Sequence, residues 1–454
     1  MCDVPTACVG TLSHFTDEYL MNDHTRRKPP GNIVLPALSP PMISADDAAR
    51  FAHEAIGNKR DKEYGGLILQ GESGRFFATL PIGGNLYVDF TLLLAVDAQG
   101  NFIHPDGYTC HGLYHSHPNV LALVKKKYPG LPEAGAHLAM NFFTDVEKAF
   151  MIRHRGFAKA FYLSGAETCL LKYEPSGSPE EDLLAEEIRN ERPTGTFYLV
   201  EEIIDELARA GRLSVVIPNT LWGNVRGQFV GNWIATEPVN KAKVPTEQPF
   251  CSPIDDQPDE LVGKFVSADS ANADVEFMGA ILKAQGTQEY VATFPWRERT
   301  SLAAVLDEFP RHMDGGPRLP AGFHIDGFYA VTHAKPVHLP AQQDWLYKNF
   351  FAPFELAALI TQSRRADALR DPERGLTLYK RTHTKALLSY TCSGSEAETA
   401  LMEDNGETLQ KALKAGTLTT FEFVLQVAAA GRLMVVQEGN IWDKTGLVEP
   451  GWEP

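Results

Sequence analysis

The feature that most constrains this chain is an internal repeat, in which short words from the first half recur in the second half in the same order. Residues 63–69 read EYGGLIL, and residues 276–282 read EFMGAIL. The other matched pairs are 78–81 with 292–295, 112–114 with 327–329, 141–143 with 349–351, 176–178 with 393–395, 210–216 with 430–436, and Trp222 with Trp442. One such match arises easily by chance, whereas an ordered series at nearly constant spacing indicates a tandem duplication.

The repeat predicts two domains of one fold, and a chain of 454 residues is also longer than one hydrophobic core usually organises. The predicted first domain is 41–236 and the second is 259–454. Prolines crowd residues 237–258 between them, and since proline fixes φ and lacks an N–H, this segment reads as an extended linker. Residues 1–40 are predicted to form an N-terminal arm without regular structure.

Composition excludes several classes of protein. The net charge of −16 argues against nucleic acid as a main partner, because phosphate binding needs a basic surface. The tight basic run Lys125 to Lys127 reads as a solvated loop. No stretch of 18 apolar residues occurs, so we expect no membrane span.

The expected location follows from two further absences. The N-terminus lacks the basic and apolar regions of a Sec signal peptide. The six cysteines are scattered without a C-x-x-C pair, which suits a reducing compartment. We expect a cytoplasmic protein, or one exported by a specialised, non-Sec machinery.

Hydrophobic periodicity predicts a mixed α+β fold for each copy. In the first copy, a capping-box pattern at 44–47 starts a helix that ends at Gly57, and a second such pattern at 144–147 starts a helix through His154. The predicted strands are 63–69, 75–80, 86–96, 108–117, 157–163 and 168–173, and two further helices are predicted at 180–191 and 197–210.

A pair of histidines ends one predicted strand. His115 and His117 are two residues apart, so their side chains leave the same face, and Pro118 then ends the ladder. Zinc binds neutral imidazole nitrogen well and keeps an open position in catalytic sites. The third protein ligand should be a carboxylate in the first turn of the next helix, for which Glu147 is the first choice and Asp145 the rival.

Two more residues fit the chemistry of hydrolysis. Glu63 stands at the start of an apolar strand, where a carboxylate is costly unless it has a function. It is the expected general base for a metal-activated water. Thr144 is expected to donate a hydrogen bond to the developing oxyanion. Strict alternation also places His111 on the face of His115 and Cys110 on the opposite face, and we assign both of these to packing.

In their order and spacing these residues resemble the JAMM (JAB/MPN) metalloprotease family, over about residues 44–175. Glu63 matches the catalytic glutamate of that family, His115 and His117 its histidine ligands, Thr144 its serine, and Glu147 stands where it has an aspartate ligand. The resemblance implies two tandem JAMM-like (cytidine-deaminase-like) α/β/α domains, each a mixed sheet flanked by helices. It also implies a zinc-dependent metallohydrolase that cleaves peptide or isopeptide bonds in a protein or peptide substrate, including ubiquitin-like conjugates.

The chain departs from the family pattern at two points. The third ligand would be Glu rather than Asp, and residues 119–141 form a far longer spacer before Thr144. Residues 157–173 are also similar to a JAMM-like bacterial domain of Rhs-type toxins. Two alternatives therefore stay open: a catalytically silent JAMM-like scaffold or adaptor, and a secreted bacterial toxin or effector that hydrolyses another amide, such as a peptidoglycan crosslink.

The second copy has lost the histidines. In the aligned segment His115 becomes Ala330 and His117 becomes Thr332, although Glu276 and Glu355 remain. We therefore expect one metal site, in the first copy, with the second copy structural or substrate-binding.

Overall fold

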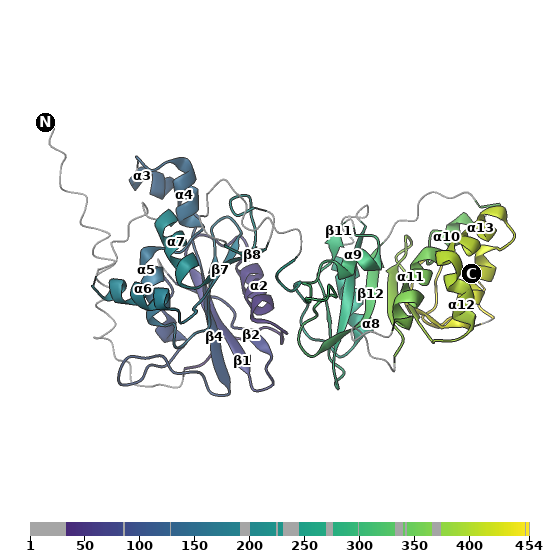
Figure 1. The fold of residues 1–454 in the computed structure, drawn as a ribbon, viewed down its shortest axis with the longest axis horizontal. Coiled ribbons are helices and arrows are strands. Elements are labelled where there is room, and N and C mark those ends of the chain that lie inside the picture. The colour runs from purple at the N-terminus through teal and green to yellow at the C-terminus, as the bar shows by residue number, and fades with distance from the viewer. Residues whose placement is uncertain are drawn as a thin grey trace. The chain divides into compact units, whose positions relative to one another are not determined.

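The computed structural model shows two compact units, Met1–Lys243 and Val244–Pro454, which we call the first and second unit and describe separately. It describes residues 33–84, 87–127, 129–190, 200–223, 226–229, 245–268, 276–297, 299–331, 339–340, 343–365, 374–449 and 451–453. The fold is mixed α+β, with one mixed sheet flanked by helices in each unit (Figure 1).

The first unit is built on a sheet with the strand order β2-β1-β4-β5-β6-β7-β8, and β3 also pairs with β1. The strands are β1 Tyr64–Gly71, β2 Phe76–Ala78, β3 Ile82–Gly83, β4 Tyr108–Ser116, β5 Ala160–Ser164, β6 Leu170–Glu174, β7 Arg212–Ile217 and β8 Gly227–Gln228. Only the β4–β5 pair is parallel. Because parallel strands end at the same edge, the segments that follow β4 and β5 meet there.

Helices cover both faces of this sheet. The helices of this unit are α2 Ala45–Ile56, α3 Leu121–Lys127, α4 Glu133–Met140, α5 Asp145–Arg153, α6 Pro179–Asn190 and α7 Val200–Ala210, of which α3 packs on α4 beyond the sheet (Figure 1). From α2, Asp46 accepts a hydrogen bond from Tyr162 of β5. The adjacent residue Phe161, on the other face, packs in the core beneath α5, α6 and α7.

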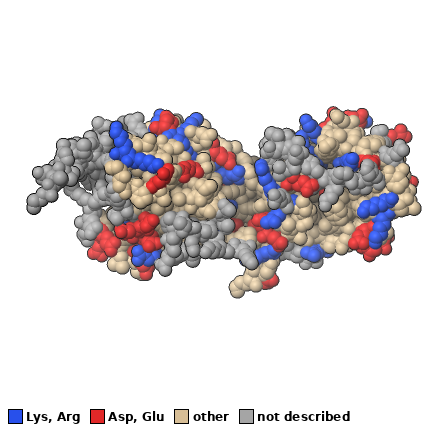
Figure 2. All heavy atoms as spheres, turned by 90° about the horizontal axis from the view of Figure 1, so that it is seen from above, with Lys and Arg blue, Asp and Glu red and all other residues tan. Residues whose placement is uncertain are grey.

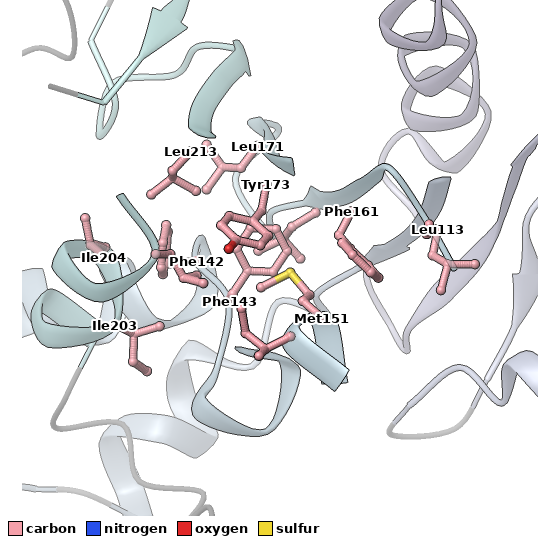
Figure 3. Close-up of a cluster of buried hydrophobic side chains, with 14 of the residues drawn as sticks. Leu113, Phe142, Phe143, Met151, Phe161, Leu171, Tyr173, Ile203, Ile204 and Leu213 are labelled. Atoms are coloured by element: carbon pink, nitrogen blue, oxygen red, sulfur yellow. The ribbon is translucent and has the colours of Figure 1, made fainter. Parts of the chain in front are cut away.

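That core is rich in aromatic side chains. Phe142, Phe143 and Tyr173 are fully buried in it, together with Ile203 and Ile204 of α7 (Figure 3). Phe142 and Phe143 precede α5 directly, so their burial anchors the start of this helix against the sheet. This packing fixes where the first turn of α5 lies relative to the end of β4.

The second unit has a sheet with the corresponding order β10-β9-β12-β13-β14-β15-β16, and β11 also pairs with β9. The strands are β9 Phe277–Ala284, β10 Tyr290–Ala292, β11 Trp296–Arg297, β12 Phe323–Val331, β13 Thr377–Arg381, β14 Leu387–Thr391, β15 Arg432–Gln437 and β16 Gly446–Leu447. The helices are α8 Pro258–Ala268, α9 Leu302–Leu306, α10 Asp344–Tyr347, α11 Pro353–Arg364, α12 Ala397–Met402, α13 Glu407–Ala415 and α14 Thr420–Ala430.

Glycine is required at one equivalent position in each unit. A Cβ on Gly66 would collide with the hydroxyl of Tyr114, which donates a 2.6 Å hydrogen bond to the Thr79 carbonyl. In the second unit, a Cβ on Gly279 would collide with Tyr329, whose hydroxyl donates to Thr293 over 2.5 Å. The glycine that the two repeated words share is therefore needed for close approach of a tyrosine.

Most predicted elements of the first unit are present. Ser44 accepts a hydrogen bond from the Asp47 N–H and caps α2, and Thr144 caps α5. The strand predicted at 86–96 is wrong. Its described part contains a 3-10 turn, Phe90–Leu92, capped by Asp89. It buries Val88, Phe90, Leu93 and Leu94 in the core without joining the sheet, and Tyr87 and Leu92 are exposed.

A β-bulge in β4 corrects the predicted faces of two residues. Gly112 pairs with Ile68 while Cys110 pairs with Leu69, so His111 is an extra residue and the alternation shifts there. Cys110 therefore joins the core cluster. His111 instead packs edge-on against Phe76, at a ring-centroid distance of 5.0 Å.

The segments predicted as an arm and as a linker carry β-bridges in their described parts. In the segment predicted as an arm, Leu38 pairs with Thr79, next to β2. In the segment predicted as a linker, Cys251 pairs with Thr293 and Asp255 with Tyr290. The last residues of each segment therefore pack onto the unit that follows them.

The described surface carries charged side chains of both signs (Figure 2). On the face shown in Figure 2, Lys and Arg side chains are interspersed with Asp and Glu over the described residues. Lys125 to Lys127 lie in α3 rather than in a loop, and Lys125 pairs with Glu133 at 2.8 Å. The described helices include none long and apolar enough to cross a membrane. The four described cysteines, Cys110, Cys169, Cys251 and Cys392, are buried thiols rather than disulfide partners.

Candidate metal centre

Three predicted ligands converge where β4 meets α5. The Nε2 atom of His115 lies 2.7 Å from Oε1 of Glu147, and the Nε2 atom of His117 lies 2.9 Å from the same oxygen. Ligand atoms of all three residues lie within 4.8 Å of one another. Two imidazole nitrogens and one carboxylate oxygen form a donor set that suits zinc, with a fourth position left for water or substrate.

The capping box of α5 orients the carboxylate. Oε2 of Glu147 accepts a 2.7 Å hydrogen bond from the Thr144 N–H, while the Glu147 N–H donates to the Thr144 hydroxyl over 3.3 Å. Oε1 is thereby directed toward the two histidines. The same local motif that starts the helix also places the third ligand.

The spacer before α5 orients His117. The Nδ1 atom of His117 lies 3.3 Å from the carbonyl oxygen of Met140, the last residue of α4. A carbonyl can only accept, so Nδ1 donates its proton to Met140, and Nε2 is the nitrogen directed toward Glu147 that can bind a metal once it gives up its own proton. The long spacer of residues 119–141 therefore contains the helices α3 and α4 and supports a ligand directly.

Glu63 lies beside the histidines without joining the ligand set. In the β1–β4 pair, Gly65 faces His115, and continuing this register past the end of β1 places Glu63 opposite His117 on the same face. Burial raises the pKa of Glu63 to about 7, against the opposing effect of the two imidazoles, and the Val88 N–H donates a hydrogen bond to its carboxyl group. A carboxyl with such a pKa can accept and release a proton near neutral pH.

The charges within the cluster are strongly coupled. Burial by itself disfavours a charged His117, but the carboxylates of Glu147 and Glu63 outweigh it and raise the pKa of His117 to about 9. Burial likewise disfavours a charged Glu147, and the two imidazoles outweigh it and hold the pKa of Glu147 well below its usual value. The carboxylate of Glu147 is therefore held ionised, as a metal ligand must be.

The rival ligand is placed elsewhere. Oδ1 of Asp145 accepts a hydrogen bond from the N–H of Val146, over 2.9 Å, and Asp145 is absent from the convergent group. Thr144 lies at the N-cap, where its hydroxyl oxygen accepts from Glu147 and its hydroxyl proton is left for another acceptor.

The second unit has a lysine at the corresponding place. Glu355, in the first turn of α11, accepts a hydrogen bond from the Ala352 N–H. Its carboxylate also forms an ion pair with Lys380 of β13, with 2.6 Å between Nζ and Oε2. Ala330 pairs with Lys380 in the sheet, just as His115 pairs with Leu163. Thr332, predicted to replace His117, lies outside the described residues.

Sequence reasoning missed the supporting groups. The Met140 carbonyl and the Val88 N–H are backbone atoms, and no residue type signals their role. Asn141 did carry a signal, because it belongs to one of the repeated words. Its amide donates to the His137 carbonyl and accepts from the Glu167 N–H. In the second unit, Asn349 likewise donates to the Trp345 carbonyl and accepts from the Thr384 N–H.

Comparison with known proteins adds no relative. No protein-family model, no curated protein and no solved structure matches this chain.

Proposed function

We propose that this protein is a zinc-dependent hydrolase of peptide or isopeptide bonds, with one active centre in the first unit. The observation that carries the proposal is the convergence of His115, His117 and Glu147 on one point, with Glu63 beside them and outside the ligand set. His115, His117 and Glu147 would hold the metal. Zinc, when bound there, would act as a Lewis acid and lower the pKa of water at the site.

The other steps belong to this chain. Glu63 takes a proton from the attacking water and delivers it to the leaving amine, a transfer that balances the charge of the reaction. The Thr144 hydroxyl donates a hydrogen bond to the oxygen that gains charge during attack. Met140 keeps His117 in the tautomer that can bind metal.

We also propose that the two units are JAMM-like domains that arose by tandem duplication. Their strand orders correspond, and each has a β-bulge at the same place in the β1–β4 or β9–β12 pair. Buried contacts correspond as well: Tyr162 with Asp46 and Tyr379 with Asp259, and Tyr173 with Glu181 and Tyr390 with Glu398. Such matched polar pairs support common descent beyond similar hydrophobic patterning.

Metal analysis of the purified full chain tests the function first. We expect about one zinc per chain, and we expect H115A combined with H117A to abolish zinc binding. E63Q should keep the zinc and reduce hydrolysis by at least about 100-fold, since general acid–base catalysis contributes that much. If the wild-type chain bound no zinc, the proposed enzymatic function would be contradicted and a catalytically silent scaffold would be favoured.

Substrate assays then distinguish a hydrolase of protein or peptide substrates from one that acts on peptidoglycan. Ubiquitin-like conjugates, unmodified peptides and peptidoglycan fragments are offered to the zinc-loaded chain. Cleavage of peptidoglycan crosslinks alone would contradict a protein substrate and favour the toxin or effector alternative.

A further inference from the structure

A polar cleft of about 420 Å³ borders the edge of the first sheet where β4 and β5 end. Its lining includes Lys59 and Arg60 from the loop after α2, Asn119 from the segment after β4, and Thr168 from the β5–β6 turn. Asn119 and Thr168 follow β4, which carries the two histidines, and its neighbour β5. The cleft and the candidate metal centre are therefore at the same edge of the sheet.

One carbonyl oxygen joins the cleft to the centre. The carbonyl of Ser164, at the end of β5, accepts hydrogen bonds from the His117 N–H and from Nη1 of Arg60, each over 3.0 Å. Asn119 is two residues beyond His117, so their Cα atoms lie no more than roughly 7 Å apart. In an extended peptide this separation corresponds to about two residues.

The lining favours an anionic group. Lys59 is exposed and Arg60 is held in place by Ser164, through both its carbonyl and its hydroxyl oxygen. The one carboxylate of the lining, Asp61, already accepts a hydrogen bond from the Tyr64 hydroxyl, over 3.0 Å. The Thr168 hydroxyl donates its proton to the Glu167 carbonyl, so the groups that face a ligand are the two cations and the side-chain amide of Asn119. These groups suit a carboxylate through charge-assisted hydrogen bonds.

We propose that this cleft is a substrate subsite that binds a carboxylate located about two residues from the bond cleaved at the metal centre. This inference rests on the proposed function. The carboxylate has two sources, an acidic side chain or the free C-terminus of the substrate, and both present the same group to Lys59 and Arg60.

Binding is tested without catalysis. Glutarate, a dicarboxylate probe, is titrated into the metal-free full chain while backbone amide signals are followed by NMR. We expect saturable shifts at Lys59, Asn119 and Thr168. K59E should raise the Kd for glutarate roughly fivefold or more, as reversal of one partly exposed charge implies. K59Q should have a smaller effect in the same direction.

The matched control is K126E, which makes the same charge change at an exposed position of α3 outside the cleft lining. If K126E and K59E weakened glutarate binding equally, the effect would come from the overall charge of the protein, and the proposal would be overturned. Shifts confined to His115, His117 and Glu147 would also overturn it, and so would tighter binding of inorganic phosphate than of glutarate.

Hydrolysis by the zinc-loaded chain then distinguishes the two sources. Peptide pairs differ by Glu against Gln, or by a C-terminal acid against an amide, and K59E should remove the preference for whichever acid is favoured. Glutarate binding by a chain that takes up no zinc when zinc is supplied would contradict the proposed function and keep the carboxylate site. If the chain shows zinc-dependent hydrolysis but its amide signals do not shift with glutarate, only the proposed subsite is contradicted.

Discussion

At the scale of single residues, Ser164 ties together two side chains that lie behind the candidate centre. Its hydroxyl oxygen lies 2.9 Å from Nη2 of Arg60 and 2.7 Å from Nδ1 of His53. Arg60 can only donate, which leaves the Ser164 proton available to Nδ1 of His53 when the neutral ring carries its own proton on Nε2. Burial, with the nearby Arg60 and Arg50 charges, lowers the pKa of His53 from 6.5 to about 4.

This shift makes the stability of the first unit depend on pH. Below pH 6.5 the unfolded chain protonates His53, while the folded chain does so only near pH 4. The unfolded state thus binds more protons in this window. As the pH is lowered from 6.5 to about 4, the free energy of unfolding should therefore decrease, by up to about 3 kcal/mol. Urea unfolding of the metal-free chain across this range measures the loss.

H53Q is the control, because glutamine can still accept from Ser164 and does not titrate. Its unfolding free energy should fall less steeply with pH than that of the wild type. His111, whose pKa burial also lowers to about 4, is present in both proteins and cancels in the difference. Identical slopes for H53Q and wild type would show that His53 is not the group responsible.

At the scale of elements, α5 and α11 present a carboxylate in the same way and neutralise it differently. Glu147 faces two imidazoles, which leave room for a metal ion, whereas Glu355 faces the ammonium group of Lys380. The side chains of Lys380 and Glu355 are 4% and 11% exposed, so this ion pair is almost dry. The lysine supplies internally the positive charge that a metal would otherwise bring.

Removing that lysine should destabilise the second unit. K380M keeps most of the side-chain volume but leaves Glu355 as a buried charge without its cation, which costs about 3–5 kcal/mol when one partner of a buried pair is removed. Chemical denaturation should show this loss. Combining K380M with E355Q should recover much of it, because the amide carries no charge and can still accept from the Ala352 N–H. A double variant no more stable than K380M would refute an electrostatic origin.

The same elements show what the sequence could predict. The residues Thr144 to Glu147 predicted both a helix start and the position of a candidate ligand, because a capping box is local and its geometry follows from residue type. The bulge at His111 has no such local signature, so period-two alternation assigned Cys110 and His111 to the wrong faces. The run at 86–96 is apolar enough for a strand, but Asp89 caps a 3-10 turn and the run fills the core as a loop.

At the scale of the whole molecule, the two units share a strand order and differ in what they can bind. Only in the first do described residues form a group able to hold a metal. A ligand that binds the folded state stabilises only the unit that contains its site. Zinc should therefore act on half of the chain, which makes it a probe of whether the units unfold independently.

We expect calorimetry of the full chain to show two unfolding transitions, because each unit has its own sheet and buried core. Free zinc at about 100 times its Kd should stabilise one transition by about 2.7 kcal/mol and leave the other in place. H115A with H117A should abolish the zinc response, and K380M should lower the transition that zinc does not move. If zinc and K380M shifted the same single transition, the units would unfold as one, and the second would then support the first through coupled stability.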